Sequence, residues 1–384
     1  MAGNIQRRPD GKWRARYRDA NHREHARHFS RKRDAEQWLA SHEVAIARGE
    51  WVDPALSKIT VGEWLPQWLA LQVQLKPTTM VRYEVALRSQ ILPRWELVPL
   101  SRITHSDVSS WVHGLIDEGL APATVRYAHR VLSLALTAAV RDGRLIRNVA
   151  EGVPLPRLVA TPKRFLTHDQ VQALAEACAP YDTLIRVLAY AGLRWGELVA
   201  LTACRIDLAR RRIEVVEAIT EVHGRLVVGT TKTHQRRSVP IPRFLVDELA
   251  DHLAGKAPGD LVFTAPEGGV LRNTNFRPRF FDPAAEKAGL LGLTPHELRH
   301  TAASLAIAAG ANVKAVQLML GHASAAMTLD IYAGLFADDL DAVADRLDRA
   351  FVKLNADQMR TKRRTSRSDQ IELPVENPPE QGTG

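Results

Sequence analysis

Residues 294–334 constrain the fold of this chain more than any other stretch, because start and stop signals divide them into three helices. Pro295 suits a first helical turn, and apolar residues follow at helical spacing from Leu298 to Ala309. Gly310 ends that pattern. The spacing places three side chains that carry or can accept a positive charge on one face of the first helix: His296, Arg299 and His300.

A second helix is expected from Val313 to Leu320, with Gly321 as its C-cap and His322 in the following turn. Ser324 can N-cap a third helix, on which Tyr332 lies ten residues beyond His322. Both side chains are therefore expected near the first helix. An aromatic residue on a short amphipathic helix more often packs in a core than attacks a substrate, so Tyr332 alone leaves both interpretations open.

The cations expected around Tyr332 give a chemical reason to consider it a nucleophile. A phenol has a pKa near 10, so forming its anion at pH 7 costs roughly 4 kcal/mol. A site dense in arginine and histidine could lower that cost by stabilising the anion. The same cations would hold a phosphate group.

A further basic residue precedes this stretch in the sequence AYAGLRWGELVAL. Gly192 interrupts one apolar helix there, and Arg194 lies in the turn before a second helix opens at Gly196. A helix N-terminus favours anions, and a guanidinium beside it can contact phosphate oxygens with two prongs. The alternative is a solvated arginine in a turn between helices.

Lys232 is expected at the tip of a β-hairpin. Leu226–Thr231 and Ser238–Ile241 look like two strands, and the six residues between them, beginning with Lys232, would connect them. By itself, such a lysine is more often an ordinary surface residue.

Taken together, these motifs resemble the tyrosine recombinase (phage integrase) family over the range Lys163–Val352. GLRWGEL, the hairpin lysine, HELRH, LGHAS and a later tyrosine occur in the family's order and spacing. The resemblance implies that Arg194 and Arg299 clamp the scissile phosphate and that Tyr332 attacks it. It also implies that Lys232 protonates the leaving 5′ oxygen. The remaining matches are His296 and His322, which would assist by hydrogen bonding or proton transfer, and Glu197, at the family's acidic supporting position.

The resemblance further implies a site-specific DNA recombinase, an integrase of a phage or other mobile element, that acts through a 3′-phosphotyrosyl intermediate. No metal or nucleotide cofactor is expected. The expected partner is double-stranded DNA with core-type and arm-type attachment sites, bound by a homotetramer, with a host DNA-bending protein and a directionality factor as further partners. A DNA-binding regulator without strand transfer is an alternative that the complete set of residues argues against.

The segment from His296 to His300 also fits the H-E-x-x-H pattern of zinc peptidases, with two imidazoles one helical turn apart. Such a site needs a third ligand, and the sequence shows no second metal-ligand cluster. Arg299 would also place a cation beside the metal. We therefore expect no metal at this motif.

Composition fits an anionic polymer as partner but does not require one. The chain has 384 residues, 45% of them hydrophobic, and a net charge of +9, which predict two or three domains with real cores. It has two cysteines, no apolar run of membrane-spanning length and no visible signal peptide. We expect a location in the bacterial cytoplasm and no membrane partner.

The first 33 residues hold eleven Lys or Arg against three acidic residues, a local net charge of +8. After a turn at residues 9–11, apolar and basic residues alternate over Trp13–Tyr17, and a second strand is expected at His22–Phe29 before a helix capped by Ser30. The basic residues of the first strand are Arg14, Arg16 and Arg18. This module, residues 1–55, resembles the arm-type DNA-binding domain of phage integrases; the alternative is a solvated basic face.

Residues 60–153 are expected to form an all-α bundle. Its helices should start at Thr60, Thr78, Thr104 and Pro122. The last helix has an apolar stripe over Val125–Ala139 and ends at Gly143. By the same resemblance this bundle is the core-binding domain, and each candidate contact to phosphate is an ordinary surface charge on pattern alone. The candidates are Lys76, Arg82, Arg126 and Arg130.

A proline-marked linker at residues 154–163 leads to the catalytic domain, residues 163–355, which Thr167 opens with a capping box. A further helix is expected at Asp339–Phe351, and residues 356–384 are expected to be disordered. The predicted fold is that of tyrosine recombinases. It comprises a small N-terminal sheet with a helix, an all-α bundle, and a mainly α catalytic domain with a small antiparallel sheet.

Overall fold

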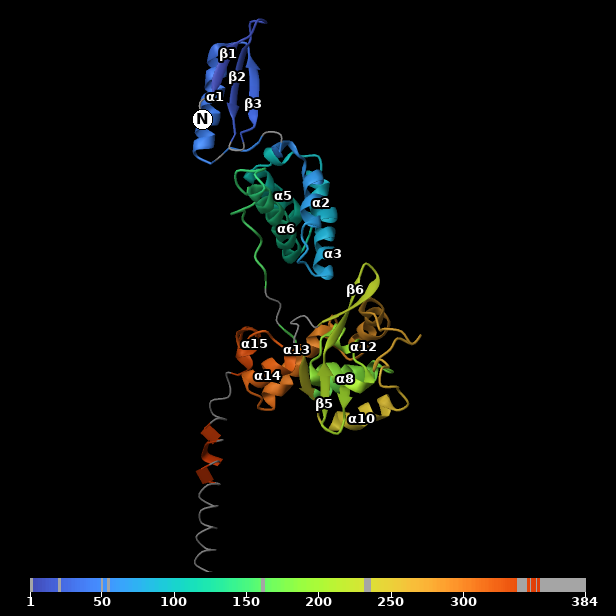
Figure 1. Ribbon diagram of the computed structural model, residues 1–384. Coiled ribbons are helices and arrows are strands. Elements are labelled where there is room, and N and C mark those ends of the chain that lie inside the picture. Colours follow the sequence, from blue (N-terminus) through green and yellow to red (C-terminus); the bar gives the residue numbers. More distant parts are fainter. Residues whose placement is uncertain are drawn as a thin grey trace, which may run out of the picture. The chain divides into compact units, whose positions relative to one another are not determined.

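The computed structural model describes residues 3–19, 22–49, 51–53, 56–159, 163–230, 236–336 and seven residues between 344 and 352. The chain divides into two compact units, Met1–Thr161 with Glu221–Arg225, and Pro162–Thr220 with Leu226–Gly384. Figure 1 shows the elements within each. Of the helices in the described ranges, none is both long and apolar enough to cross a membrane.

The N-terminal module is a three-stranded antiparallel sheet covered by one helix (Figure 1). Its elements are β1 (Asn4–Arg7), β2 (Trp13–Arg18), β3 (Glu24–Phe29) and α1 (Lys32–Ala47). Ala15 and Tyr17 of β2 are buried where α1 packs on the sheet, together with Ala35 and Leu39 of the helix. The alternation predicted for β2 is therefore confirmed, because its apolar residues face the helix.

The sequence prediction for this module was wrong at two points. It missed β1, which pairs along its length with β2 and has Asn4 opposite Arg16. A short edge strand of mostly polar residues gives no alternating signal, so pattern alone does not reveal it. The prediction also placed the cap of α1 at Ser30, whereas Arg31 occupies the N-cap position without a capping side-chain hydrogen bond.

A helical bundle follows within the first unit (Figure 1). Its elements are a 3-10 turn (Leu56–Lys58), α2 (Val61–Ala70), α3 (Pro77–Ala86), a π-helical turn (Leu87–Ile91), α4 (Leu92–Trp95), a 3-10 turn (Leu100–Arg102), α5 (His105–Asp117) and α6 (Pro122–Arg141). Capping boxes at Thr60 and Thr104 and Pro122 in the first turn of α6 confirm three predicted starts. The start expected at Thr78 lies one residue earlier, at Pro77.

The apolar stripe of α6 forms the centre of this bundle. Val125, Leu132 and Ala139 are fully buried, as the helical spacing predicted. Trp64 of α2 donates its indole N–H to the carbonyl oxygen of Ala135 at 3.0 Å, so this buried indole has a hydrogen-bond partner within the bundle.

The second unit is mainly helical and carries two small sheets (Figure 1). Its helices are α7 (His168–Ala177), α8 (Asp182–Ala191), α9 (Trp195–Leu198), α10 (Phe244–Leu253), α11 (Asn273–Phe276), α12 (Asp282–Lys287), α13 (Pro295–Ala308), α14 (Val313–Leu320) and α15 (Ala325–Tyr332), with 3-10 turns at Ala203–Arg205 and Ala333–Leu335 and a π-helical turn at Arg277–Phe281. Thr167 caps α7 as predicted. Helix α8 is buried along most of its length and packs against α7, α10 and α13.

The two sheets overturn the predicted hairpin around Lys232. Their strands are β4 (Ile206–Asp207), β5 (Arg212–Val215), β6 (Glu217–Val222), β7 (Arg225–Thr230) and β8 (Arg237–Pro240). Strand β7 pairs with β6 through His223 and Gly224, both at positive φ as a tight hairpin turn requires. Strand β8 instead joins β5, because its Val239 is fully buried opposite Ile213.

Several predictions fall on parts that the structure leaves undescribed. Lys232 lies outside the described residues, as do the tail at residues 356–384 and much of the helix predicted at residues 339–351. In the predicted linker, residues 154–159 have no regular secondary structure.

Candidate active site

Helix α13 presents Arg299 to the ends of two other helices. Thr294 and Glu297 form a capping box that fixes the start of α13. Arg299 is 3% exposed and donates to the carbonyl oxygens of Gly192, at 2.6 Å, and Leu320. Helix C-termini leave carbonyl groups unpaired, so this one guanidinium satisfies the ends of both α8 and α14. Burial lowers the pKa of Arg299 to about 9, which leaves it charged at neutral pH.

Two glycines allow these helix ends to approach each other. Gly192 and Gly321 both have a φ of 64°, in the left-handed region that side-chain-bearing residues rarely adopt. A Cβ on Gly192 would lie 2.8 Å from the side chain of Leu320, and one on Gly321 would lie 3.0 Å from that of Arg237. The glycines that marked helix ends in the sequence therefore also set the spacing of the site.

Arg194 occupies the N-cap position of α9, which confirms its predicted place beside a helix start. Its guanidinium donates to Glu197 Oε1 at 2.9 Å and to the carbonyl oxygen of Gly321 at 3.2 Å. Arg194 and Arg299 thus both bind the turn that joins α14 to α15. Although Arg194 and Arg299 are 105 residues apart in the sequence, they meet at the backbone of Leu320 and Gly321.

Glu197 is a buried carboxylate that holds two arginines in place. Arg237 donates to its Oε1 and Oε2 at 2.9 and 2.6 Å, and Arg194 donates to Oε1. Burial alone would raise the pKa of Glu197, but the hydrogen bonds and charge of Arg237, with those of Arg194, lower it to about 2. Glu197 is therefore ionised at neutral pH and binds both Arg194 and Arg237.

Arg237 is a residue that the sequence interpretation missed. It had been assigned to the connection around Lys232, but it is the first residue of β8 and its Nε donates to the carbonyl oxygen of Met319 at 3.0 Å. Arg237 and the buried Val239 are two residues apart on one strand and so face the same side. The spacing of two residues between Arg237 and the apolar Val239 was the signal that could have revealed the role of Arg237. A cation on the buried face of a strand needs a buried partner.

Tyr332 is the last residue of α15 and is 1% exposed. Ser324 caps this helix by accepting from the N–H of Met327, as predicted. The Tyr332 hydroxyl forms a hydrogen bond with Nδ1 of His300 at 2.8 Å. Burial raises the pKa of Tyr332 to about 12, and the nearby Arg299 offsets only part of that rise. Arg299 therefore lowers the cost of ionising Tyr332, as the sequence suggested, but the loss of water around the phenol outweighs this effect and the net cost rises.

The two histidines predicted for the site differ in their surroundings. His322 is buried, its Nδ1 forms a hydrogen bond with Thr328 Oγ1 at 2.9 Å, and its ring lies parallel to that of Tyr332 with centroids 6.4 Å apart. Burial, then the charges of Arg299 and Arg194, lower the pKa of His322 to about 4, so it is neutral at pH 7. His296 is exposed on α13 and meets the ring of His300 edge-on at 5.2 Å.

The zinc alternative gains no support from this geometry. His300, one of the two histidines of the motif, forms its hydrogen bond with Tyr332. Within the described ranges, no group of three His, Cys, Asp or Glu side chains is arranged to hold a metal ion.

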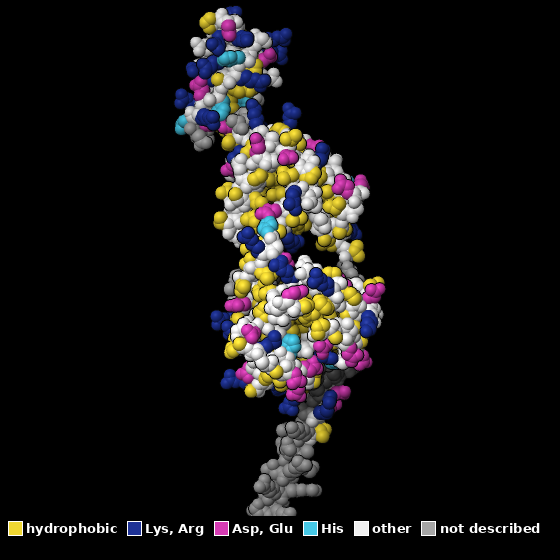
Figure 2. Space-filling view, turned by 90° about the vertical axis from the view of Figure 1, so that its right-hand side faces the viewer, with side chains coloured by type: hydrophobic (Ala, Val, Ile, Leu, Met, Phe, Trp, Pro, Cys, Tyr) yellow, Lys and Arg dark blue, Asp and Glu magenta, His cyan; other side chains and the backbone are white. Residues whose placement is uncertain are grey.

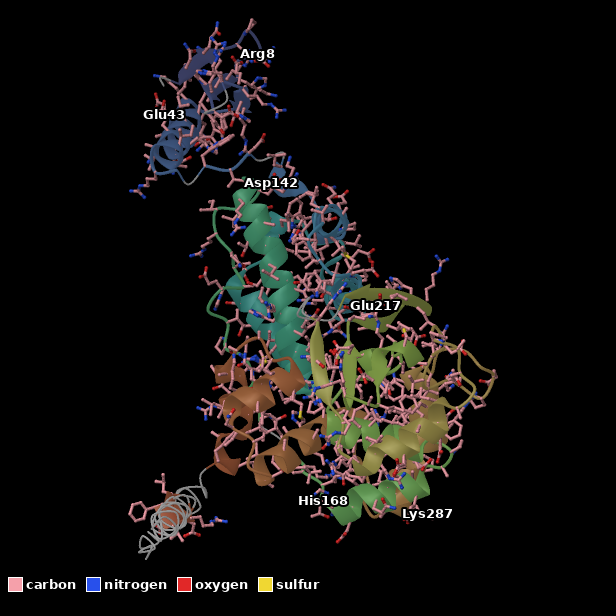
Figure 3. All side chains as sticks on the ribbon, turned by 60° about the horizontal axis from the view of Figure 1, so that its bottom comes forward. Arg8, Glu43, Asp142, His168, Glu217 and Lys287 are labelled. Carbon is pink, nitrogen blue, oxygen red and sulfur yellow. The ribbon has the colours of Figure 1, made fainter. Side chains whose placement is uncertain are left out.

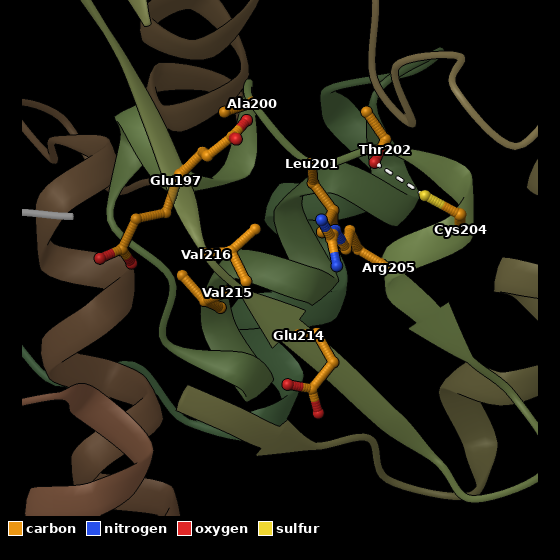
Figure 4. Close-up of a pocket in the computed structure, with 10 residues that line it drawn as sticks. Glu197, Ala200, Leu201, Thr202, Cys204, Arg205, Glu214, Val215 and Val216 are labelled. Carbon is orange, nitrogen blue, oxygen red and sulfur yellow. Dashed lines mark hydrogen bonds between the residues drawn. The ribbon is translucent and has the colours of Figure 1, made fainter. Parts of the chain in front are cut away.

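A small pocket is lined in part by Glu197 (Figure 4). Its lining includes Ala200, Thr202, Cys204 and Glu214, and neither Arg194 nor Arg299 contributes to it. Thr202 Oγ1 and Cys204 Sγ lie 3.4 Å apart at its edge.

The candidate DNA contacts of the first unit are surface cations in several settings. Figure 2 shows many Lys and Arg side chains on the N-terminal module. Arg14 and Arg16 both pair with Glu24 on the next strand, at 2.9 and 3.6 Å, while Arg18 is exposed. They lie on the sheet face opposite the buried Ala15 and Tyr17, or at its edge.

The bundle's candidates are less uniform. Arg82 lies over the ring of Tyr127, with its guanidinium carbon 4.4 Å from the ring centroid. Arg126 donates to the carbonyl oxygen of Pro156 at 3.1 Å and so binds the start of the linker. Lys76 and Arg130 are exposed. Arg126 is thus partly engaged within the protein, which weakens its prediction as a phosphate contact.

Comparison with protein families matches three models along the chain. Residues 164–338 match the phage integrase family, residues 1–48 the phage integrase N-terminal domain, and residues 60–116 the phage integrase N-terminal SAM-like domain. Among curated proteins, the integrase of Mycobacterium phage D29 is 29% identical over 340 residues, covering 84% of this chain and 88% of that protein. A putative prophage phiRv2 integrase of Mycobacterium tuberculosis is 28% identical over 346 residues, covering 85% of this chain and 90% of that protein.

Solved structures share the fold. The Tn1549 transposon integrase in complex with transposon right end DNA has a TM-score of 0.64 at 23% identity, covering 76% of this chain and 99% of that one. A lambda integrase tetramer bound to a Holliday junction has a TM-score of 0.59 at 20% identity, covering 85% of this chain and 94% of that one. Fold and site together define a DNA strand transferase of the tyrosine recombinase class. The chain belongs to the phage integrase family, and its activity is site-specific DNA recombination.

Proposed function

We propose that Tyr332 is the nucleophile of this recombinase and that Arg194 and Arg299 bind the phosphate it attacks. The observation that carries this assignment is the convergence of three elements. The N-terminus of α9, the face of α13 and the turn between α14 and α15 meet where both guanidiniums bind the backbone of Leu320 and Gly321. Main-chain carbonyls hold the two cations in place before any phosphate arrives, and preorganised donors of this kind stabilise the charge that develops in a transition state.

The proposed reaction conserves the energy of the phosphodiester bond. Tyr332 Oη bonds to phosphorus, the bond from phosphorus to the 5′ oxygen breaks, and a 3′-phosphotyrosyl link remains. The 5′ oxygen takes a proton from Lys232, and attack by a 5′-hydroxyl of another strand reverses the sequence. His296 and His322 assist by hydrogen bonding. Because Tyr332 is 1% exposed, its hydroxyl must become accessible before it attacks.

We assign the partners and domains on the same basis. Residues 1–55 would bind arm-type sites, residues 60–153 would bind core-type sites with residues 163–355, and the tail at 356–384 has no assigned role. The cations at Arg14, Arg16, Arg18, Lys76, Arg82, Arg126 and Arg130 are the proposed contacts to DNA. The solved structure of the Tn1549 integrase is a complex with transposon right end DNA, and that of the lambda integrase is a tetramer bound to a Holliday junction. A homotetramer on DNA in the bacterial cytoplasm, aided by a host DNA-bending protein and a directionality factor, follows by analogy.

Replacing Tyr332 by phenylalanine tests the assignment. Tyr332→Phe removes one oxygen, so covalent capture of a nicked core-site duplex should be abolished while binding to that duplex stays within about twofold. Tyr190→Phe is the matched control, since Tyr190 also bonds to a histidine in the same unit. Covalent adduct formed by Tyr332→Phe, measured on a denaturing gel, would show that another group is the nucleophile.

A further inference from the structure

His300 has no role in the function proposed above, yet it is the side chain that forms the hydrogen bond with the nucleophile. Its Nδ1 lies 2.8 Å from the Tyr332 hydroxyl, with the two rings at 61° and their centroids 5.8 Å apart. This edge-on approach directs a ring nitrogen at the phenol oxygen. His322, by contrast, uses its Nδ1 for Thr328 and lies parallel to the phenol ring.

At pH 7 both partners are in the protonation states from which transfer of a proton from tyrosine to histidine starts. Burial, then His296, Lys163 and Arg299, lower the pKa of His300 to about 4, against a smaller opposing effect of Glu297. The ring is therefore neutral at pH 7 and has one nitrogen free to accept a proton. Tyr332 has a pKa raised to about 12 by burial, so only about one molecule in 10⁵ would ionise unaided at pH 7.

We propose that His300 is the general base that takes the proton of Tyr332 during strand cleavage. This proposal rests on the function proposed above. Nδ1 accepts the hydroxyl proton as Tyr332 Oη bonds to phosphorus, the bond to the 5′ oxygen breaks, and that oxygen receives its proton from Lys232. His300 then carries the proton and returns it to Tyr332 when a 5′-hydroxyl displaces the phosphotyrosyl link.

This assignment gives the basic side chains on α13 separate tasks. Arg299 contacts the C-terminal ends of α8 and α14, while His300, the next residue, contacts Tyr332 of α15. The required tautomer has its proton on Nε2, because Nδ1 must accept. A positive charge formed on His300 would lie near Arg299 and Lys163, and the bound phosphate would offset that repulsion.

Two substitutions separate proton transfer from mere positioning. His300→Asn keeps a polar side chain near the place of Nδ1 but cannot take the proton. His300→Phe keeps a ring of similar size but can neither form the hydrogen bond with Tyr332 nor take its proton. The matched control is His168→Asn, since His168 Nδ1 lies 2.8 Å from the Tyr190 hydroxyl, the same kind of bond at the start of α7 (His168 is labelled in Figure 3). The single-turnover rate of covalent capture on a nicked core duplex would be measured from pH 6 to pH 9.

We expect both His300 variants to lose about a hundredfold or more in capture rate at pH 7, as is usual for loss of a general base. Their capture rates should then rise about tenfold per pH unit, because the phenol of Tyr332 must lose its proton to solvent before it attacks. The capture rates of the wild type and of His168→Asn should not change with pH over this range. Replacing the bridging 5′ oxygen by sulfur should not rescue them, since sulfur relieves only the need for an acid.

Other outcomes overturn the proposal. Capture that is unchanged or faster would mean that His300 only restrains the tyrosine, and a loss of the same size at every pH would mean a structural role. If the variants fail to bind core DNA, the pH dependence of the wild-type capture rate tests the proposal instead. A wild-type rate that rises tenfold per pH unit from pH 6 to pH 9 would exclude a general base with a low pKa. Tyr332→Phe, measured in parallel, distinguishes failure of the proposed function from failure of this inference. Covalent adduct in Tyr332→Phe would refute the proposed function. No adduct in Tyr332→Phe, together with a wild-type capture rate in the His300 variants, would refute only the role of His300.

Discussion

The arginines of the second unit and those of strand β2 carry the same charge in opposite settings. Arg299 is 3% exposed and Arg237 has an 8% exposed side chain, and each is bound by main-chain carbonyls or the buried Glu197. Arg14 and Arg16 have side chains that are 39% and 40% exposed and share one partner, Glu24. The first group is fixed before DNA binds, and the second can rearrange.

In the function proposed above, this difference separates arginines that act in catalysis from arginines that recruit DNA. A guanidinium held by the backbone cannot follow a moving phosphate, so it favours the geometry in which it was placed, and that is how charge stabilisation accelerates a reaction. Exposed arginines release counterions from DNA wherever a phosphate comes within reach. We therefore expect DNA affinity to depend on the number of cations on β2. We expect stabilisation of the transition state to depend on the positions of the arginines around Gly321.

The largest effect is expected when a fixed arginine loses its geometry but keeps its charge. Arg299→Lys cannot bind both helix ends, because an ammonium lacks the planar fork, so covalent capture should fall about a hundredfold or more while core binding changes little. Arg186→Lys is the control: Arg186 is also buried, but pairs with Asp182 and Glu248. Capture rates of the two variants within threefold of each other would mean that Arg299 is only structural.

A smaller effect is expected at the carboxylate that holds the fixed group. The pKa of Glu197 is lowered from 4.5 to about 2, so its contribution to stability is present above pH 4.5 and is lost as the pH falls toward 2. A shift of this size corresponds to about 3 kcal/mol. Glu197→Gln should therefore lower the free energy of unfolding of the second unit by about 3 kcal/mol at pH 7 and remove that acid-dependent loss.

Urea unfolding followed by hydrogen exchange in peptides of α8 and α13 would measure this. The control is Glu248→Gln, since Glu248 pairs with Arg186 at 2.9 Å but has a side chain that is 33% exposed. Such a pair contributes about 1 kcal/mol or less. Equal losses in both variants would contradict the special position of Glu197.

Local signals in the sequence predicted much of the frame that carries the fixed group. Thr167 and Ser324 indicate helix starts because their side chains cap the first turn, and Gly192 and Gly321 indicate helix ends because they adopt the left-handed backbone conformation. Each signal acts within a few residues, so one sequence suffices to find it. Arg194 was placed beside a helix start by a signal of this kind, and Arg299 was placed on its helix by the helical spacing that follows Pro295.

What the sequence did not reveal depends on contacts between distant residues. The partner of β8 is β5, and no local pattern distinguishes that pairing from a hairpin with β7. Arg237 was missed with it, because its burial follows from that pairing. The raised pKa of Tyr332 depends on how much water the packed site excludes, which residue types alone do not give.

The smallest effect, and the most direct test of the division between fixed and exposed arginines, is covalent capture by the full chain carrying Arg14→Ala, Arg16→Ala and Arg18→Ala together. The substrate is a short nicked core duplex without an arm site, with Arg299→Lys measured beside it. The exposed arginines should be dispensable there, so the triple variant should capture within about twofold of the wild type while its integration between attachment sites fails. A capture rate as low as that of Arg299→Lys would show that the two groups of arginines do not have separate tasks.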